Sequence, residues 1–287
     1  MTVFKLGMRD SNEMLCAGWL KVNMKFMLKI KICVLSLMAV AVTGHAQSVK
    51  ADEKGLWDVW CGGTNSAFEA SEMAKACKKF RTSAPQDPFT VVVSGLEAWN
   101  HLKKGDTGTA TAIFNTMLVK GPATGLRKAG DEMARSWLSR LDRDQVTRAL
   151  KDIYRRDIEF PASLEVFTAL GDKAPPLTDR WGKPWVYKRG SAIKGMETQR
   201  YDLESSVLGM RSDLKGALKM GYAERIDIKA VRMVTGNKSV VEFKTGEGRS
   251  IFREEGDRGN IVNLIYVGSY IIVLSDGNHW SVMAKPR

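Results

Sequence analysis

The sequence predicts an α+β fold in which helices come first and short antiparallel strands follow. Apolar residues recur at helical spacing between residues 68 and 154, whereas after residue 226 they alternate in short runs separated by glycine-containing turns. Between these regions, alternation that starts at Trp185 and returns over 199–204 predicts one β-hairpin. We therefore expect a helical N-terminal module, a small antiparallel β-hairpin domain, and a C-terminal small all-β barrel or sandwich.

The first segment of the chain, residues 1–46, is predicted to be absent from the folded protein. A basic stretch precedes an apolar run of eleven residues from Ile32 to Val42, and small residues then lead to Ala46. This order is typical of a secretory signal peptide at 24–46, with 1–23 as an upstream extension. An uncleaved membrane anchor is the alternative, although the run is short for a membrane-spanning helix. The mature protein would be exported to the periplasm, and its peripheral association with the cell envelope is left open.

The charge of the mature chain does not indicate a nucleic-acid partner. Without residues 1–46 the chain has 38 basic and 30 acidic residues, a net charge of +8. The basic residues are interspersed with acidic ones and stand in isolated pairs, which is typical of a solvated surface. Two histidines, His101 and His279, are too few for a histidine-based metal cluster. No metal, cofactor or small-molecule substrate is predicted.

Two cysteines remain in the mature chain, Cys61 and Cys77. An even number of cysteines in an exported protein predicts a disulfide between them. It would close a loop of about 16 residues and stabilise the fold by about 3 kcal/mol if the effect is entropic. A helix is expected from Phe68 to Phe80, so the disulfide would tie that helix to the preceding segment.

The predicted N-terminal module, 47–130, contains a segment at 89–122 that resembles one tetratricopeptide-type helical hairpin. The spacing that carries this resemblance is that of Gly105, Asp106, Ala110, Phe114 and Pro122. Such hairpins dock other proteins, so the resemblance implies a docking role. An ordinary antiparallel helix pair is the alternative, because a single repeat does not bury its own apolar face.

The next predicted domain, 131–222, begins with two consecutive helices. Apolar residues recur at helical spacing over 131–141 and again over 146–154. Asp142 lies between the two runs and is followed three residues later by Gln145, as in a capping box. We therefore expect the first helix to end near Leu141 and Asp142 to cap the second.

A motif-rich stretch runs from Phe160 to Ser205. Its order and spacing resemble the C-terminal domain of the major pseudopilin of type II secretion over about sixty residues. The resemblance implies a pseudopilin-like α+β domain in which the motif residues are structural and not catalytic. The residues that carry it are Phe160, Pro161 and Leu164 in a turn, Asp179, Trp181, Gly182, Pro184, Trp185 and Tyr187 at a strand start, and Tyr201, Asp202 and Leu203 in the last strand.

Two features depart from that family. The chain has no prepilin cleavage site, so it is not expected to polymerise as ordinary pilins do. The family's calcium loop after the last strand is also missing, because Asp213 is the only acidic residue over 205–216. Hard cations need several oxygen ligands close together, so no calcium site is predicted there.

Residues 223–287 predict a compact β unit of six strands. Its pattern resembles the periplasmic homology region of type II secretion clamp proteins and type IV pilus alignment lipoproteins, with matches at Val241–Phe243, Glu255–Asp257 and Val273–Gly277. The strands are expected at 226–235, 238–244, 249–254, 261–267, 270–274 and 279–283.

The resemblances together imply a protein that assembles with others and does not catalyse. No Gly-x-Ser-x-Gly, His-x-x-Glu-His or phosphate-binding glycine motif occurs in the chain, so no enzyme is predicted. The prediction is a non-catalytic exported component of a type II secretion or type IV pilus-like assembly, whose partners are other envelope proteins of that machinery. A free-standing periplasmic or extracellular binding module is the alternative.

Overall fold

A computed structural model describes residues 50–64, 70–190, 199–219, 228–234, 240–245, 250–259 and 262–284. The predicted signal peptide at 24–46 and most of the hairpin loop lie outside these ranges. Within them, helices combine with small antiparallel sheets, so the α+β prediction is confirmed at this coarse level. None of the helices described is long and apolar enough to cross a membrane.

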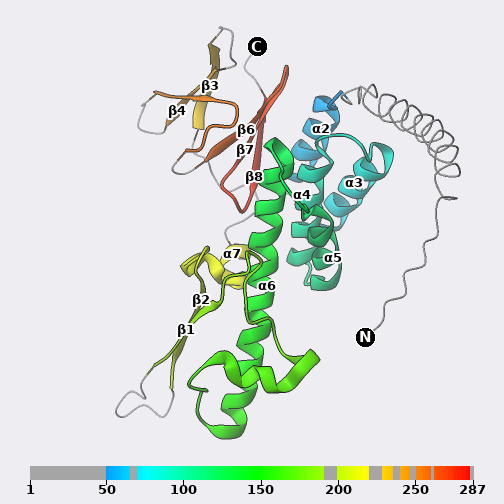
Figure 1. Cartoon of the computed structure of the whole chain (residues 1–287). Coiled ribbons are helices and arrows are strands. Elements are labelled where there is room, and N and C mark those ends of the chain that lie inside the picture. Colours follow the sequence, from blue (N-terminus) through cyan, green and yellow to red (C-terminus); the bar gives the residue numbers. More distant parts are fainter. Residues whose placement is uncertain are drawn as a thin grey trace, which may run out of the picture. The chain divides into compact units, whose positions relative to one another are not determined.

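The helical part surrounds a central helix, α4 (Thr90–Lys103), in which ten of the fourteen residues are buried. Its packing partners are α3 (Ala70–Ser83), α5 (Thr107–Met117) and α6, while α2 (Glu53–Thr64) packs on α3 (Figure 1). Asp106 begins α5 by accepting a hydrogen bond from the Thr109 N–H at 3.0 Å. Helices α4 and α5 thus form the expected antiparallel pair, joined by a turn in which Gly105 has a φ of 79°.

Helix α6 (Gly125–Asp157) is continuous over 33 residues, where the sequence predicted two helices. Asp142 does not cap a second helix. Its carboxylate lies inside α6 and forms an ion pair with Arg180. The capping-box prediction is therefore wrong, because the acidic side chain is bound by a distant guanidinium and leaves the helix uninterrupted. The helix ends at Ile158, which has a φ of 59°.

The C-terminal half of α6 is covered by the 3₁₀ segment η1 (Leu164–Lys173) and by an antiparallel hairpin. The hairpin pairs β1 (Trp185–Arg189) with β2 (Tyr201–Ser205), with Trp185 opposite Ser205 and Tyr187 opposite Leu203. These elements enclose a cluster of buried apolar residues: Val146, Leu150, Phe160, Phe167, Trp185 and Leu203. The short segments η2 (Met210–Ser212) and α7 (Leu214–Lys219) follow β2.

All six predicted strands of the C-terminal region are present, but they do not close into a barrel. One antiparallel sheet has the order β3-β4-β5, and a second has the order β6-β7-β8. The barrel alternative is therefore wrong for the residues that the structure describes. The strands are β3 (Ile228–Val234), β4 (Val240–Thr245), β5 (Ser250–Glu254), β6 (Asn263–Val267), β7 (Ile271–Ser275) and β8 (Trp280–Ala284).

Strand β7 is buried along its whole length because both of its faces are covered. Ile271 and Val273 join the core of the helical part, which also includes residues of α2 to α6. Ile272 and Leu274 point to the opposite face, where they pack with Phe243 of the other sheet. Two separate cores therefore explain the apolar run of this strand. The larger core contains residues from all three predicted domains, 47–130, 131–222 and 223–287.

The predicted disulfide between Cys61 and Cys77 is not formed. Cys61 lies on the exposed side of α2, whereas Cys77 faces the core from α3 and is fully buried. The Cys77 thiol lies 3.6 Å from the sulfur of Met73, and burial raises the pKa of this thiol well above its ordinary value. The prediction was wrong because an even cysteine count does not reveal that one thiol serves as an apolar core residue.

Candidate binding site

Most of the motif residues between Phe160 and Leu203 hold the hairpin against α6. The indole N–H of Trp185 donates to the Pro176 carbonyl at 2.7 Å, and the Tyr187 hydroxyl donates to the Pro161 carbonyl at 2.8 Å. Leu164, Tyr187 and Tyr201 pack half-buried around the same cluster, while Pro184 and Asp202 are exposed. These positions give the motif a structural role within this hairpin.

Asp179 organises the turn that precedes β1. Its carboxylate is buried and accepts hydrogen bonds from the N–H groups of Trp181 and Lys183, both at 3.0 Å. The hydroxyl of Ser205 donates to the same carboxylate at 2.7 Å. Gly182 closes the turn with a φ of 76°, which a residue with a Cβ rarely adopts. The result is a tight turn in which Trp181, unlike Trp185, remains outside the buried cluster.

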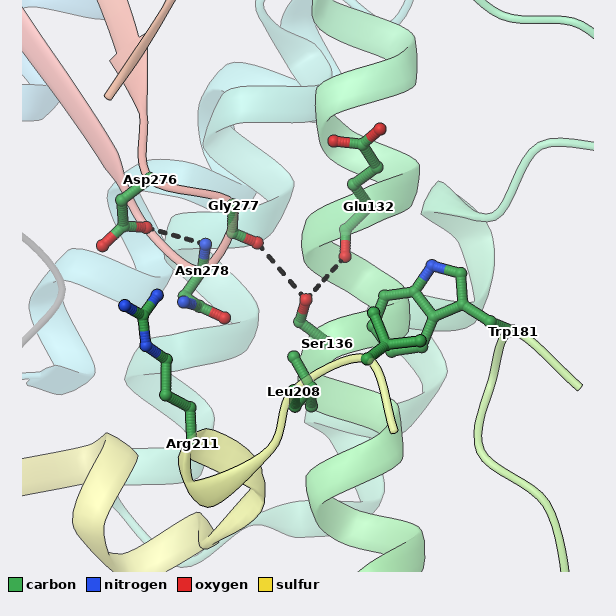
Figure 2. A pocket seen from close by; sticks show the side chains of 9 residues that line it. Glu132, Ser136, Trp181, Leu208, Arg211, Asp276, Gly277 and Asn278 are labelled. Atoms are coloured by element: carbon green, nitrogen blue, oxygen red, sulfur yellow. Dashed lines mark hydrogen bonds between the residues drawn. The ribbon is translucent and has the colours of Figure 1, made fainter. Parts of the chain in front are cut away.

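Trp181 instead lines a cavity of about 380 Å³, which we term the Trp181 pocket. Four segments meet there: the N-terminal half of α6, the turn before β1, the segment that follows β2, and the β7–β8 turn (Figure 2). Its lining residues are Glu132, Ser136, Trp181, Val207, Leu208, Arg211, Asp276, Gly277 and Asn278.

The Trp181 side of the pocket is fixed to α6 through the neighbouring residue, Arg180. The Arg180 guanidinium makes a bidentate pair with Asp142, with distances of 2.5 and 2.9 Å. Its backbone N–H donates to the Ser139 hydroxyl at 3.0 Å, and its carbonyl accepts from Arg135. Bidentate pairs of this kind fix orientation as well as distance, so the turn is held firmly on the helix.

Ser205 connects that turn to the next wall of the pocket. While its hydroxyl donates to Asp179, its oxygen accepts the N–H groups of Val207 at 3.1 Å and Leu208 at 3.2 Å. One buried hydroxyl therefore positions both the turn that bears Trp181 and the loop that bears Val207 and Leu208.

The β7–β8 turn is attached to α6 by a further set of hydrogen bonds. The Trp137 indole N–H donates to the Asn278 carbonyl at 2.8 Å, and the Ser136 hydroxyl lies 3.3 Å from the Gly277 carbonyl. Arg140 donates to the Asn278 side-chain oxygen at 2.7 Å and to the Arg211 carbonyl at 2.9 Å. These bonds join the turn and the loop to one rigid helix.

Arg140 and Asp276 are both ionised at neutral pH. Burial lowers the pKa of Arg140 to about 10, although the charge of Asp276 opposes this shift, and Arg211 adds to it. The Arg140 guanidinium also lies over the Trp137 ring, 4.6 Å from its centre. Burial alone would raise the pKa of Asp276, but hydrogen bonds from His279 and from the Asn278 and His279 N–H groups lower it overall.

The one hydroxyl group that lines the pocket is held by backbone carbonyls. The Ser136 hydroxyl donates to the Glu132 carbonyl at 2.9 Å, so its proton is directed to a backbone oxygen and not to a base. Among the described residues, no group of three or more histidines, cysteines and carboxylates is placed to hold a metal ion. Asp213, the single acidic residue over 205–216, accepts the Gly216 N–H at 2.6 Å and begins α7.

Several residues that line or support this pocket were not singled out from the sequence. Ser136, Arg140 and Asn278 are polar residues in segments that read as ordinary helix or turn, and nothing local indicates that they are buried. The one available signal is that α6 carries polar residues on every side between residues 135 and 144, which is unusual for a helix with a single apolar stripe.

Comparisons with protein-family models, with curated proteins and with solved structures found no match to this chain.

Proposed function

We propose that this protein is a non-catalytic exported component of a type II secretion or type IV pilus-like assembly, and that it works by binding another envelope protein. The observation that carries the binding role is the Trp181 pocket with its exposed apolar border. Val207, which lines the pocket, is 50% exposed, the Trp181 indole is half-buried, and Met210, next in sequence to the lining residue Arg211, is 87% exposed. Apolar side chains gathered around a preformed pocket mark interaction sites in soluble proteins.

The rigidity of the pocket supports this role. Its walls are joined to α6 by hydrogen bonds from the side chains of Arg140, Trp137 and Arg180. A site that is already ordered loses little conformational entropy when a partner binds. Tryptophan is also among the residues most enriched at the energetic centres of protein interfaces.

The assignment to a secretion or pilus-like machine rests on the sequence. The stretch 160–205 resembles the pseudopilin domain, and its residues pack as a hairpin on a long helix, which suits an assembly role (Figure 1). The resemblances of 89–122 to a docking hairpin and of 223–287 to a clamp module support the same class of partner. In this proposal the helical module, the pseudopilin-like hairpin domain and the β unit each present a face to the assembly.

Site-specific photocrosslinking in intact cells tests the proposal. A photoreactive amino acid in place of Met210, which is highly exposed and next in sequence to the lining residue Arg211, is expected to capture a secretion or pilus subunit. The matched control is the same substitution at Leu170, which is 51% exposed on η1 and does not line the pocket. If position 210 captures no such subunit and deletion leaves secretion and pili unchanged, the assembly role is refuted and a free-standing binding module replaces it.

A further inference from the structure

Resting on that binding role, we infer that the Trp181 pocket receives a basic side chain, lysine or arginine, from an exposed segment of the partner protein. Three features of the pocket lead to this partner chemistry: its charge, the position of its indole, and a cation from this same chain that already approaches it.

The pocket lining contains more carboxylates than guanidinium groups, although the buried guanidinium of Arg140, behind the lining, also interacts with Asp276. Two carboxylates, Glu132 and Asp276, stand against one guanidinium, that of Arg211. Asp276 is engaged already, since it accepts the N–H groups of Asn278 at 2.7 Å and His279 at 2.6 Å. Figure 2 shows Arg211 on the same side of the pocket as Asp276, whereas Glu132 lies on the other side. Glu132 is therefore the carboxylate that is available to a ligand.

The surroundings of Glu132 suit a lysine or arginine side chain in particular. Trp181 and Glu132 both line the pocket (Figure 2), so a long basic side chain that enters it can contact the indole and extend toward this carboxylate. Cation–π attraction to an indole and a charge-assisted hydrogen bond to a carboxylate each favour a guanidinium or ammonium group. Val207 and Leu208 form an apolar wall, against which the methylene groups of a long basic side chain can pack.

A cation of this chain already approaches the same carboxylate. The Arg258 guanidinium, on the segment between β5 and β6, lies 3.8 Å from Glu132 and is 70% exposed. This distance is too long for a hydrogen bond, so the contact is weak and easily displaced. Arg258 thus shows that the Glu132 carboxylate attracts a guanidinium, and a partner's basic side chain would take over that contact.

The test uses two short peptides and the purified exported protein. The probes are acetyl-Gly-Arg-Gly-amide and the same peptide with citrulline, which keeps the shape of arginine and removes its charge. Binding is followed by the shift of the Trp181 indole N–H resonance, which a Trp181→Phe variant identifies. We expect a saturable shift with the arginine peptide and about tenfold weaker binding of the citrulline peptide.

Three variants locate the interaction. Glu132→Gln is expected to lower the affinity for the arginine peptide about tenfold, because it removes the charge of the side chain and keeps its shape. Asp144→Asn is the matched control, since Asp144 is a partly exposed carboxylate on the same helix that pairs with Arg148 and does not line the pocket. Its binding should equal that of the unchanged protein. Arg258→Ala should bind the arginine peptide about twofold to fivefold more tightly, because the Arg258 guanidinium no longer competes for the Glu132 carboxylate.

Equal shifts with both peptides, no shift with either, or unchanged binding by Glu132→Gln would each overturn the inference. Its failure is separable from failure of the binding role. If photocrosslinking at position 210 still captures the partner in a Glu132→Gln background, the pocket does not use a basic side chain and the binding role stands. If the otherwise unchanged protein captures no partner, the binding role itself fails.

Discussion

The two halves of α6 are parts of one continuous helix, yet they differ in which of their residues are buried. In the N-terminal half, every residue from Ser136 to Asp142 is buried, including two serines, an arginine and an aspartate. In the C-terminal half, only Val146 and Leu150 are buried, and the remaining residues are at least partly exposed. The first half is covered by α4, α5 and the β6–β8 sheet, whereas the second is covered on one side by the hairpin.

This difference shows what a helical pattern can reveal. A helix covered on one side must keep its apolar residues in one stripe, so the stripe can be read from the sequence. A helix that is covered on several sides can bury polar residues, provided that each finds a hydrogen-bonding partner. The polar residues of the N-terminal half hold the walls of the Trp181 pocket. The candidate site therefore lies on the half of α6 whose buried residues are harder to predict from the sequence.

Replacing the central tryptophan of the N-terminal half should have the largest effect on stability. Trp137 is fully buried, stacks with Phe114 and supports Arg140, so Trp137→Ala should cost about 4–5 kcal/mol. Trp185→Ala is the matched change in the cluster that covers the other half, and it should cost about 3–4 kcal/mol. Chemical denaturation measures both. A larger loss for Trp185→Ala would show that the hairpin cluster, and not the polar half, dominates the fold.

Removing the partner of a buried charge should have the next largest effect. Arg180→Ala leaves Asp142 without its guanidinium while its side chain is only 3% exposed, so a loss of about 2–4 kcal/mol is expected at neutral pH.

The pH dependence of this loss identifies its cause. Burial raises the pKa of Asp142, although Arg180 partly opposes the shift. The folded protein therefore binds this proton more readily than the unfolded chain does, and acidification favours the folded state. The deficit of Arg180→Ala should shrink as the pH falls from neutral through the folded-state pKa. A double variant that also carries Asp142→Asn should lack this dependence, and an unchanged deficit at all pH values would contradict the explanation.

The positions of individual residues show how far sequence alone could predict this molecule. The hairpin cluster was predictable, because Phe160, Trp185 and Leu203 follow patterns of spacing and alternation that are local in the chain. All six C-terminal strands were predictable for the same reason. The Cys61–Cys77 disulfide was predicted wrongly, because a count of cysteines carries no information about which of them faces the core.

The Trp181 pocket could not be assembled from sequence. Its walls contain residues from distant parts of the chain, such as Ser136 and Gly277, which are 141 positions apart. No local pattern records such a pairing. Trp181 itself was identified from its motif, but the motif did not distinguish its half-exposed position from the buried one of Trp185.

A moderate effect is expected where the sheet that covers the N-terminal half of α6 meets α2. Glu53 accepts the N–H groups of Ser269, Tyr270 and Ile271 at 2.8, 2.6 and 3.0 Å. Glu53→Gln should cost about 1–2 kcal/mol at neutral pH, because one charged acceptor serves three donors and remains partly exposed to solvent.

The sign of the pH effect follows from the pKa of Glu53. Burial acts to raise this pKa, but the backbone hydrogen bonds and Tyr266 lower it overall. The stabilisation is therefore present above the unfolded-state pKa and is lost as the pH falls through the folded-state pKa. Thermal unfolding of the two proteins should differ at pH 7 and converge in acid. A constant difference would show that the carboxylate charge is not responsible.

A smaller effect on stability is expected at the pocket itself. Trp181 is only half-buried, so Trp181→Ala should cost about 1 kcal/mol or less, far below the cost of Trp185→Ala. The variant should nevertheless lose the crosslink from position 210, because the pocket wall is gone. A stability loss equal to that of Trp185→Ala would place Trp181 in the core and remove the case for a binding pocket.

The smallest effect should be a gain in stability at Ile158, the exposed residue at which α6 ends. Ile158 ends α6 with a φ of 59° and is 75% exposed, a conformation that is unfavourable for a β-branched residue. Glycine adopts this conformation without strain but also gives the unfolded chain more freedom, so Ile158→Gly should stabilise the fold by about 0.5–1 kcal/mol. Ile158→Asn is the second variant, because asparagine tolerates the left-handed region and keeps a side chain. Thermal unfolding measures both variants, and destabilisation by both would show that the Ile158 side chain makes stabilising contacts that outweigh the strain.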